Sequence, residues 1–221
     1  LGPGRCYRLW PEAETRALAA HDEPEIRSAD LSGLVLELAR WGVSLLDGLP
    51  WYEIPPRAAF AQAQDLLQRL GAIDAAKSIT PHGRAMAELP LHPRLAHMVI
   101  AGKAKGAGQS AAEIAALLSE RDGAARDASI DVEQRLMMLR GAAKDRWKQT
   151  VMQIRDQASL KDDMVEISHG VLVALAYPDR IAQRRGGNRF RMANGGGAVV
   201  PEHDALAKSE FIAVALLDNA G

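Results

Sequence analysis

Residues 55–94, PPRAAFAQAQDLLQRLGAIDAAKSITPHGRAMAELPLHPR, decide how this chain folds. Pro56 suits the first position of a helix, where a missing backbone N–H costs nothing. Apolar residues then recur at helical spacing on one face: Phe60, Ala63, Leu67 and Leu70. Gly71 follows as a left-handed helix stop. The stretch therefore begins with an amphipathic helix that ends at a defined glycine.

Two short extended pieces and a second helix start follow this glycine. Residues 72–74 and 77–79 are short enough to be the two arms of a hairpin. Thr80 is a favourable N-cap, and Pro81 suits the first helical position behind it. Gly83 lies just inside this second helix. A helix that leads into a small hairpin wing is the winged-helix pattern, a variant of helix-turn-helix.

The detailed string is more specific than this general pattern. It resembles the junction between the winged helix and the ratchet-like domain of the DEAH/RHA-type ATP-dependent helicases, in particular their bacterial HrpB-like branch. The matching positions are Leu70-Gly71-Ala72-Ile73, Thr80, Gly83, Leu89-Pro90, His92-Pro93 and Leu95-Ala96. The resemblance extends over nearly the whole chain.

This resemblance implies a mainly α fold. It predicts a winged helix, then a helical ratchet-like bundle, and at the C-terminus the first strands of a truncated OB-like β domain. The expected segments are 1–24, an exit strand and linker from a motor domain; 25–90, the winged helix; 91–186, the ratchet-like domain; and 187–221, the partial OB-like segment. Because the first residue is Leu1 and both ends look cut from something longer, we interpret the chain as a fragment.

Periodicity alone predicts helices from Leu91 to about Gln183, interrupted by a charged loop at Arg121–Ser129. A last long helix is expected to start at Asp162 and to stop at Tyr177-Pro178. The period then changes, and strand-like runs follow at residues 188–192, 198–200 and 211–217. Trp41, at the end of an amphipathic helix, is predicted to be a core residue.

Composition narrows the classes of function. The 221 residues carry a net charge of −1, so a global basic field does not recruit nucleic acid, and local patches must do so. The single cysteine, Cys6, excludes an internal disulfide and fits a reducing compartment. No apolar run has the roughly 18–20 residues of a membrane span, and no signal-peptide pattern is present. We therefore expect a cytoplasmic protein.

The sequence contains no convincing catalytic or cofactor site. A phosphate-binding loop needs glycines followed by Lys and Ser/Thr, and Gly102-Lys103-Ala104 lacks both the earlier glycine and the hydroxyl. His92 and His97 have no third ligand at suitable spacing, so packing or capping roles are predicted instead of metal binding. The resemblance implies an ATP-dependent helicase as the full-length parent. ATP and Mg²⁺ would then bind its RecA-like motor domains, and this fragment alone would not be catalytic.

A cluster of arginines is the strongest candidate site. Within twelve positions, against the single acid Asp179, the sequence has Arg180, Arg184, Arg185, Arg189 and Arg191. One guanidinium group can donate to two phosphate oxygens at once, so these arginines could hold the backbone of a single strand. A solvated helix end with ion pairs explains them equally well. The cluster is expected where the last bundle helix meets the first strand.

Three functions remain open at this stage. The resemblance implies an accessory region that binds single-stranded RNA or DNA and couples it to the motor domains. The alternative is a non-enzymatic winged-helix module that binds nucleic acid or regulates another protein. However, the predicted recognition helix has few cations, which favours a structural spacer. An α-helical scaffold for protein interactions is the third hypothesis.

Overall fold

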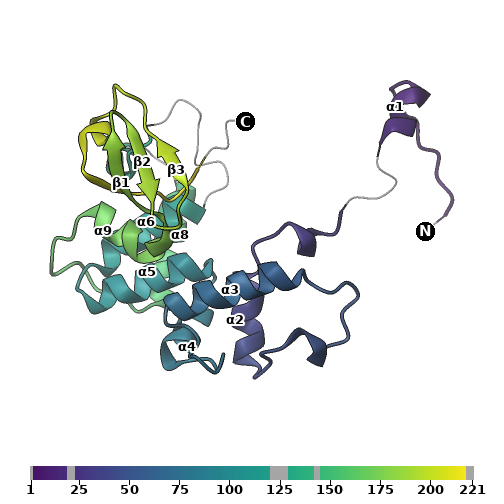
Figure 1. Ribbon diagram of the computed structural model, residues 1–221, viewed down its shortest axis with the longest axis horizontal. Helices are drawn as coiled ribbons and strands as arrows, with labels where there is room; N and C mark the ends of the chain where they lie inside the picture. Colours follow the sequence, from purple (N-terminus) through teal and green to yellow (C-terminus); the bar gives the residue numbers. More distant parts are fainter. Residues whose placement is uncertain (1, 19–22, 120–128, 142–144, 218–221) are drawn as a thin grey trace.

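The computed structural model describes residues 2–18, 23–119, 129–141 and 145–217. Parts of the predicted linker, of the predicted charged loop at Arg121–Ser129 and of the C-terminal segment lie outside this range. The N-terminal residues and α1 (Glu12–Ala17) lie away from the other elements, and none of the residues of α1 is buried (Figure 1). Residues 2–10 form no β-ladder within the described chain, and the exit strand from a motor domain stays a prediction.

The winged-helix region is built as the sequence predicts. Its elements are η1 (Glu25–Arg27), α2 (Ser32–Arg40), η2 (Leu46–Gly48), α3 (Arg57–Arg69) and α4 (Pro81–Ala87). The apolar face of α3 is buried through Phe60, Ala63 and Leu67. Gly71 has a φ of 70°, which permits the sharp stop after α3. The wing is minimal, because Ile73 and Ile79 form a single antiparallel bridge.

Thr80 and Gly83 hold the wing against α4. The Thr80 hydroxyl donates to the Gly71 carbonyl at 2.6 Å and accepts from the Gly83 N–H at 3.0 Å. The Thr80 N–H donates to the Ala72 carbonyl at 3.0 Å. That carbonyl lies so close to Gly83 that a Cβ there would be 2.0 Å from its oxygen. A side chain at position 83 is therefore excluded by the backbone itself.

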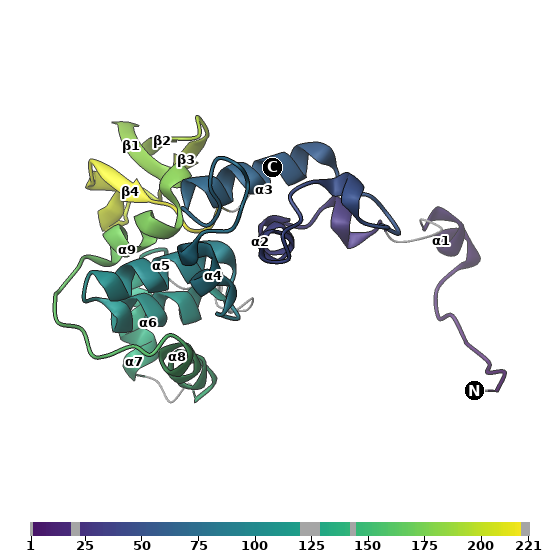
Figure 2. The same ribbon diagram turned by 90° about the horizontal axis from the view of Figure 1, so that it is seen from below.

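A helical bundle follows the wing, and its apolar positions agree with the sequence pattern. Its helices are α5 (Pro93–Ala104), α6 (Gly108–Ser119), α7 (Val132–Gly141), α8 (Asp145–Gln157) and α9 (His169–Ala176). Figure 2 shows α5 and α6 side by side, with α7 and α8 beyond them. The predicted core residues Met98, Ile114 and Leu136 are inaccessible to solvent. One continuous core joins this bundle to the winged helix.

The last helix is much shorter than predicted, because tertiary contacts hold the segment before it in an extended form. Both carboxylate oxygens of Asp163 accept from backbone N–H groups at the start of α6, those of Gln109 and Ser110. The N–H groups of Met164 and Val165 donate to the Gly106 carbonyl. This segment is therefore hydrogen-bonded to the turn between α5 and α6 and cannot join the helix, so α9 begins only at His169.

A small antiparallel sheet covers one end of the bundle (Figure 1). Its strands are β1 (Ile181–Gly186), β2 (Arg189–Met192), β3 (Gly197–Val199) and β4 (Phe211–Ala213), and their spatial order is β3-β2-β1-β4. The short helix η3 (Pro178–Arg180) precedes β1, and η4 (Ala205–Lys208) precedes β4. The prediction of helix up to Gln183 is wrong, since β1 already pairs with both β2 and β4 there. The sheet thus begins before the boundary predicted at residue 187, and β4 is shorter than the run predicted at 211–217.

The prediction for Trp41 is also wrong, since its surface is 71% exposed. Helix α2 ends in a Schellman motif, in which Val43 N–H donates to the Leu38 carbonyl at 2.8 Å and Gly42 N–H to the Ala39 carbonyl at 3.1 Å. The turn brings Val43 onto the core and leaves the ring of Trp41 outside. Within the described residues, no helix is long and apolar enough to cross a membrane.

Two histidines connect the wing region to the bundle. His82 Nε2 and His97 Nδ1 are 2.8 Å apart, and the two rings meet edge to face. Burial lowers the pKa of His82. Burial also lowers the pKa of His97 to about 4, with a contribution from His82, while a hydrogen bond with the Leu70 backbone partly opposes the shift. The pair is therefore stable while at least one ring is neutral.

We expect Gly83→Ala to destabilise the chain by about 3 kcal/mol or more, because neither backbone segment can retreat from the new Cβ. Urea unfolding measures the change. Gly33→Ala in α2 is the matched control, since open space surrounds that position, and it should be neutral or stabilise by about 0.5 kcal/mol. Equal stabilities of the two variants would contradict the close approach of Gly83 and Ala72.

We also expect acid to destabilise the joint between α4 and α5. A depressed histidine pKa means that the unfolded chain binds more protons below pH 6.5, so stability is full above that pH and falls toward pH 4. With a discount for partial exposure, His97 should contribute about 1 kcal/mol to the difference between pH 7 and pH 5. Urea unfolding at both pH values should show a smaller difference in His97→Gln, whereas His203→Gln, at an exposed position, should behave like the parent chain. An unchanged pH dependence in His97→Gln would be inconsistent with this role.

Candidate nucleic-acid interface

The register of the sheet decides where the predicted arginines lie. In β2, exposed Arg189 and Arg191 alternate with buried Phe190 and Met192. Arg191 pairs with Gln183 of β1, and Arg189 pairs with Val199 of β3. Directly paired residues share a face of a sheet, so both arginines lie on the face opposite the small apolar core.

Two further arginines lie at the far end of the β1–β2 hairpin. Arg184 pairs with Phe190 and therefore belongs to the core side, although it is exposed at the end of the strand. Arg185 lies within the irregularity between Arg184 and Gly186, where the register shifts. The fold thus brings four exposed arginines onto one hairpin, distributed over its two faces.

Arg180 is placed differently from the other four. Its Nη1 donates to the Ala215 carbonyl at 2.9 Å, and its guanidinium lies 5.2 Å from the centre of the Tyr177 ring. Its side chain is only 30% exposed, and Nε is 4.0 Å from the Asp179 carboxylate. Through these contacts Arg180 attaches the segment after β4 to the end of α9.

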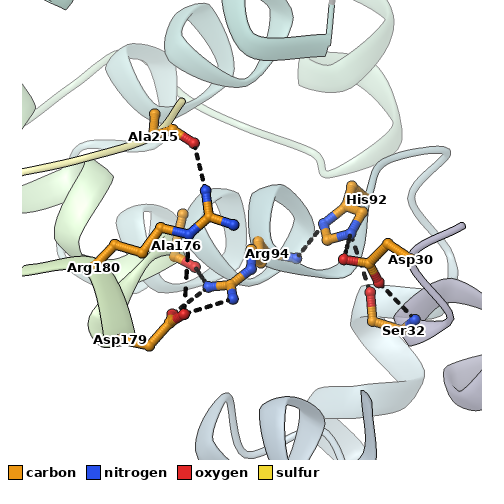
Figure 3. A network of polar contacts seen from close by, with 8 residues as sticks. All are labelled: Asp30, Ser32, His92, Arg94, Ala176, Asp179, Arg180 and Ala215. Atoms are coloured by element: carbon orange, nitrogen blue, oxygen red, sulfur yellow. Dashed lines mark hydrogen bonds and ion pairs between the residues drawn. The ribbon is translucent and has the colours of Figure 1, made fainter. Parts of the chain in front are cut away.

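Arg94, at the start of α5, anchors the sheet to the bundle (Figure 3). Its guanidinium donates to both carboxylate oxygens of Asp179, at 2.5 and 3.0 Å, and to the Ala176 carbonyl at 3.1 Å. The guanidinium carbon is also 5.1 Å from the centre of the Tyr177 ring. One buried cation therefore connects the winged-helix end of α5 to the chain that leads into β1.

Charge and burial act in opposite directions on the two titratable partners of Arg94. Burial alone would raise the pKa of Asp179, but the hydrogen bonds and charge of Arg94 outweigh it and hold that pKa below its ordinary value. For Tyr177, burial raises the pKa, and the nearby charges of Arg180 and Arg94 only partly oppose the effect. Asp179 is therefore ionised and Tyr177 is neutral near pH 7.

A second polar group fixes the other side of the α5 N-terminus, as Figure 3 shows. His92 Nδ1 accepts from the Arg94 N–H at 3.2 Å and so caps the helix, while Nε2 lies 3.0 Å from Ser32 Oγ and 3.4 Å from an Asp30 oxygen. Asp30 also accepts from the Ser32 N–H at 2.8 Å. The hydrogen bond with His92 holds the pKa of Asp30 well below its ordinary value, although burial opposes the shift. The start of α2 is thereby attached to the start of α5.

A cavity of about 490 Å³ lies between these polar groups, α3 and the sheet. Gln62, Asp65 and Arg69 of α3 line one side, and Asn194 of the β2–β3 turn lines another. Its walls carry three acids, Asp30, Asp65 and Asp179, and only two arginines, Arg69 and Arg94, so their charge disfavours a phosphate. Its position means that the recognition-type helix α3 faces the sheet across this cavity.

The structure also places the weaker sequence candidates. Gly102 and Lys103 are inside helix α5, and Lys103 Nζ donates to the Ala158 carbonyl at 2.7 Å. A helix interior offers no free backbone N–H groups to cradle a phosphate. Among the residues that the structure describes, no group of three or more His, Cys, Asp or Glu side chains is arranged to hold a metal ion. His92 and His97 instead have capping and packing contacts.

Sequence reasoning missed the role of Arg94. Arg94 directly follows the His92-Pro93 pair, and its partner Asp179 is the single acid beside the five clustered arginines. The signal was present in the helix start: an arginine after Pro93 lies on the same helical face as the buried residues. Its partner is 85 positions away in the sequence, so only the tertiary structure could reveal that the two side chains meet.

Comparisons with known proteins agree with this architecture. A family described as "Helicase associated domain (HA2), winged-helix" matches residues 63–91. The ATP-dependent RNA helicase HrpB of Escherichia coli (strain K12) is 35% identical over 223 residues, which cover 98% of this chain and 26% of that protein.

Solved structures of the same relative have the same fold. The crystal structure of the E. coli DExH-box NTPase HrpB matches with a TM-score of 0.80 and 33% identity, over 96% of this chain and 25% of that one. A second, of the Escherichia coli DEAH/RHA helicase HrpB, matches with a TM-score of 0.75 and 34% identity, over 91% and 25%. The chain thus spans about a quarter of the length of these relatives.

A helicase-associated winged helix, followed by a helical bundle and a small antiparallel sheet, defines the C-terminal accessory region of DEAH-type helicases. The chain belongs to this DEAH/RHA family, in its HrpB-like branch.

We expect Arg94→Met to destabilise the chain by about 3 kcal/mol, because the Asp179 carboxylate, whose side chain is only 17% exposed, loses both hydrogen bonds from Arg94 and keeps only the longer contact with Arg180. Thermal and urea unfolding measure this loss. Arg57→Met is the matched control, because it breaks the exposed Arg57–Asp47 pair and should cost about 0.5 kcal/mol or less. A loss in Arg94→Met no larger than in the control would contradict the anchoring role of Arg94.

Proposed function

We propose that this chain binds single-stranded nucleic acid through the exposed arginines of the β1–β2 hairpin and couples that strand to ATP-dependent motor domains. The observation that carries the proposal is the register of the hairpin, because it puts exposed Arg189 and Arg191 together on the face of the sheet opposite its small apolar core. Arg184 and Arg185 extend the charge to the hairpin tip. Arginine forks on a sheet suit a flexible phosphate backbone without requiring a particular base sequence.

The coupling part of the proposal rests on the relatives and on the rigid connection within this chain. HrpB is named an ATP-dependent RNA helicase, and the region similar to this chain is about a quarter of it. We assign ATP and Mg²⁺ binding to the RecA-like motor domains of such a protein. The Arg94–Asp179 pair would transmit a movement of the winged helix to the sheet that holds the strand. We place this function in the cytoplasm, whose reducing conditions suit the single exposed Cys6.

The position of α3 supports this function over sequence-specific binding of duplex DNA. A winged helix that recognises duplex inserts its recognition helix into the major groove. Here the face of α3 that carries Gln62, Leu66 and Arg69 borders the cavity next to Asn194 of the sheet. Its exposed Arg57 is paired with Asp47. We therefore assign α3 a structural role.

Arg189→Ala combined with Arg191→Ala should weaken binding to a single-stranded poly(U) RNA of about 20 nucleotides roughly tenfold at low salt. The slope of log affinity against log salt should fall by about 1–2, because up to two phosphates lose their partners. Fluorescence anisotropy over a salt series measures both quantities.

The matched control for this prediction is Arg16→Ala combined with Arg57→Ala. It removes the same charge from two exposed arginines that lie outside the sheet. Its affinity and salt slope should equal those of the parent chain. Equal losses in both double variants would mean that net charge, and not the hairpin, determines binding, and this result would overturn the proposal.

A further inference from the structure

The face of the sheet that carries Arg189 and Arg191 also carries an exposed aromatic ring. Phe211 is the first residue of β4, and its surface is 55% exposed. The next residue, Ile212, packs against the small core of the sheet, so alternation along the strand places Phe211 on the opposite face. That is also the face of Arg189 and Arg191.

The register of the sheet places the Phe211 ring in line with the guanidinium-bearing residue Arg191. Gln183 of β1 pairs with Arg191 of β2 on one side and with Phe211 of β4 on the other. The three residues therefore form one row across three adjacent strands. Because neighbouring strands are about 4.8 Å apart, the row is roughly 10 Å long. Chain order hides this row, since Phe211 is 20 positions after Arg191.

We propose that Phe211 is a base-stacking residue and that the row Arg191–Gln183–Phe211 forms a subsite for one nucleotide of a single strand. The proposal rests on the function proposed above and specifies the part of that site that contacts bases. Phe211 would stack on a base, Arg191 would pair with a phosphate, and Gln183 would hydrogen-bond between them. Aromatic stacking does not depend on base identity, because every base has a π face.

Charge favours nucleic acid over a protein surface as the occupant. The same face also carries Arg189, two residues from Arg191 along β2, which is paired to exposed Val199. Among the paired residues of this face, none is acidic. The acid nearest to Phe211 along the chain is Glu210, which directly precedes β4, and its carbonyl accepts from the N–H of Arg184 in β1. A cationic face with one exposed ring combines the two features that single-strand binders use, an electrostatic groove and a stacking platform.

The experiment compares the parent chain with Phe211→Leu and Phe211→Trp on two probes. One probe is a single-stranded RNA of about 20 nucleotides, and the other is the same backbone with abasic sites along its length. Phe211→Leu should weaken binding to the normal strand about five- to tenfold and leave binding to the abasic strand unchanged, because only the stacking contact is lost. Phe211→Trp should bind the normal strand as well as the parent chain or better. Tyr52→Leu, which removes a fully exposed aromatic from the connector before α3, should change neither affinity.

The outcomes separate this inference from the function on which it rests. Equal affinities of the parent chain and Phe211→Leu for the normal strand, together with a loss in the Arg189/Arg191 double variant, would overturn the stacking role alone. The same fold loss on both probes would also overturn stacking, because it would indicate a change in the sheet. No measurable binding of either probe by the parent chain would overturn the proposed function itself.

Discussion

The ion pair between Arg94 and Asp179 holds the two ends of this structure together. Arg94 belongs to the helix that continues from the wing, and Asp179 belongs to the segment that enters the sheet. A buried pair of this kind adds little net stability compared with apolar packing, but its geometry is strict, because both partners must meet or a charge stays buried alone. The fixed orientation of the sheet relative to the bundle follows from that requirement. Together with the contacts of Arg180 to Ala215 and Tyr177, it sets the direction of the hairpin arginines.

A second constraint acts at the wing. The Ala72 carbonyl approaches the backbone of Gly83 so closely that no side chain fits between them. Thr80 completes the contact by bonding to both sides of it. Since α4 leads directly into α5, this contact also sets where the bundle begins. The wing contact and the Arg94 anchor therefore lie on either side of α4.

The arginine cluster illustrates how far a linear pattern can mislead about a site. Five arginines close together in sequence predicted one basic patch, but strand pairing distributes them over different surroundings. Arg180 is held by Tyr177 and Ala215, whereas Arg189 and Arg191 face solvent. Phe211 joins the same face through β4, although no sequence pattern connects it to the arginines. The sequence therefore shows how many charges lie close together in the chain, but not which way each side chain faces.

The sequence by itself determined the local elements: the stop at Gly71, the cap at Thr80 and the apolar faces of α3, α5 and α8 follow from residue spacing and backbone preference. The family resemblance was also present in that string, because its glycines and prolines fix the backbone where the wing meets the bundle. Tertiary structure decided the extent of α9, the exposure of Trp41 and the start of the sheet at Ile181. For α9 and the sheet, a hydrogen bond or ladder to a distant segment outweighed a local preference, whereas the exposure of Trp41 follows from the turn that ends α2 and packs Val43 on the core. Propensities of less than about 1 kcal/mol per residue cannot resist such contacts, and for this reason the candidate site had to be located from the fold.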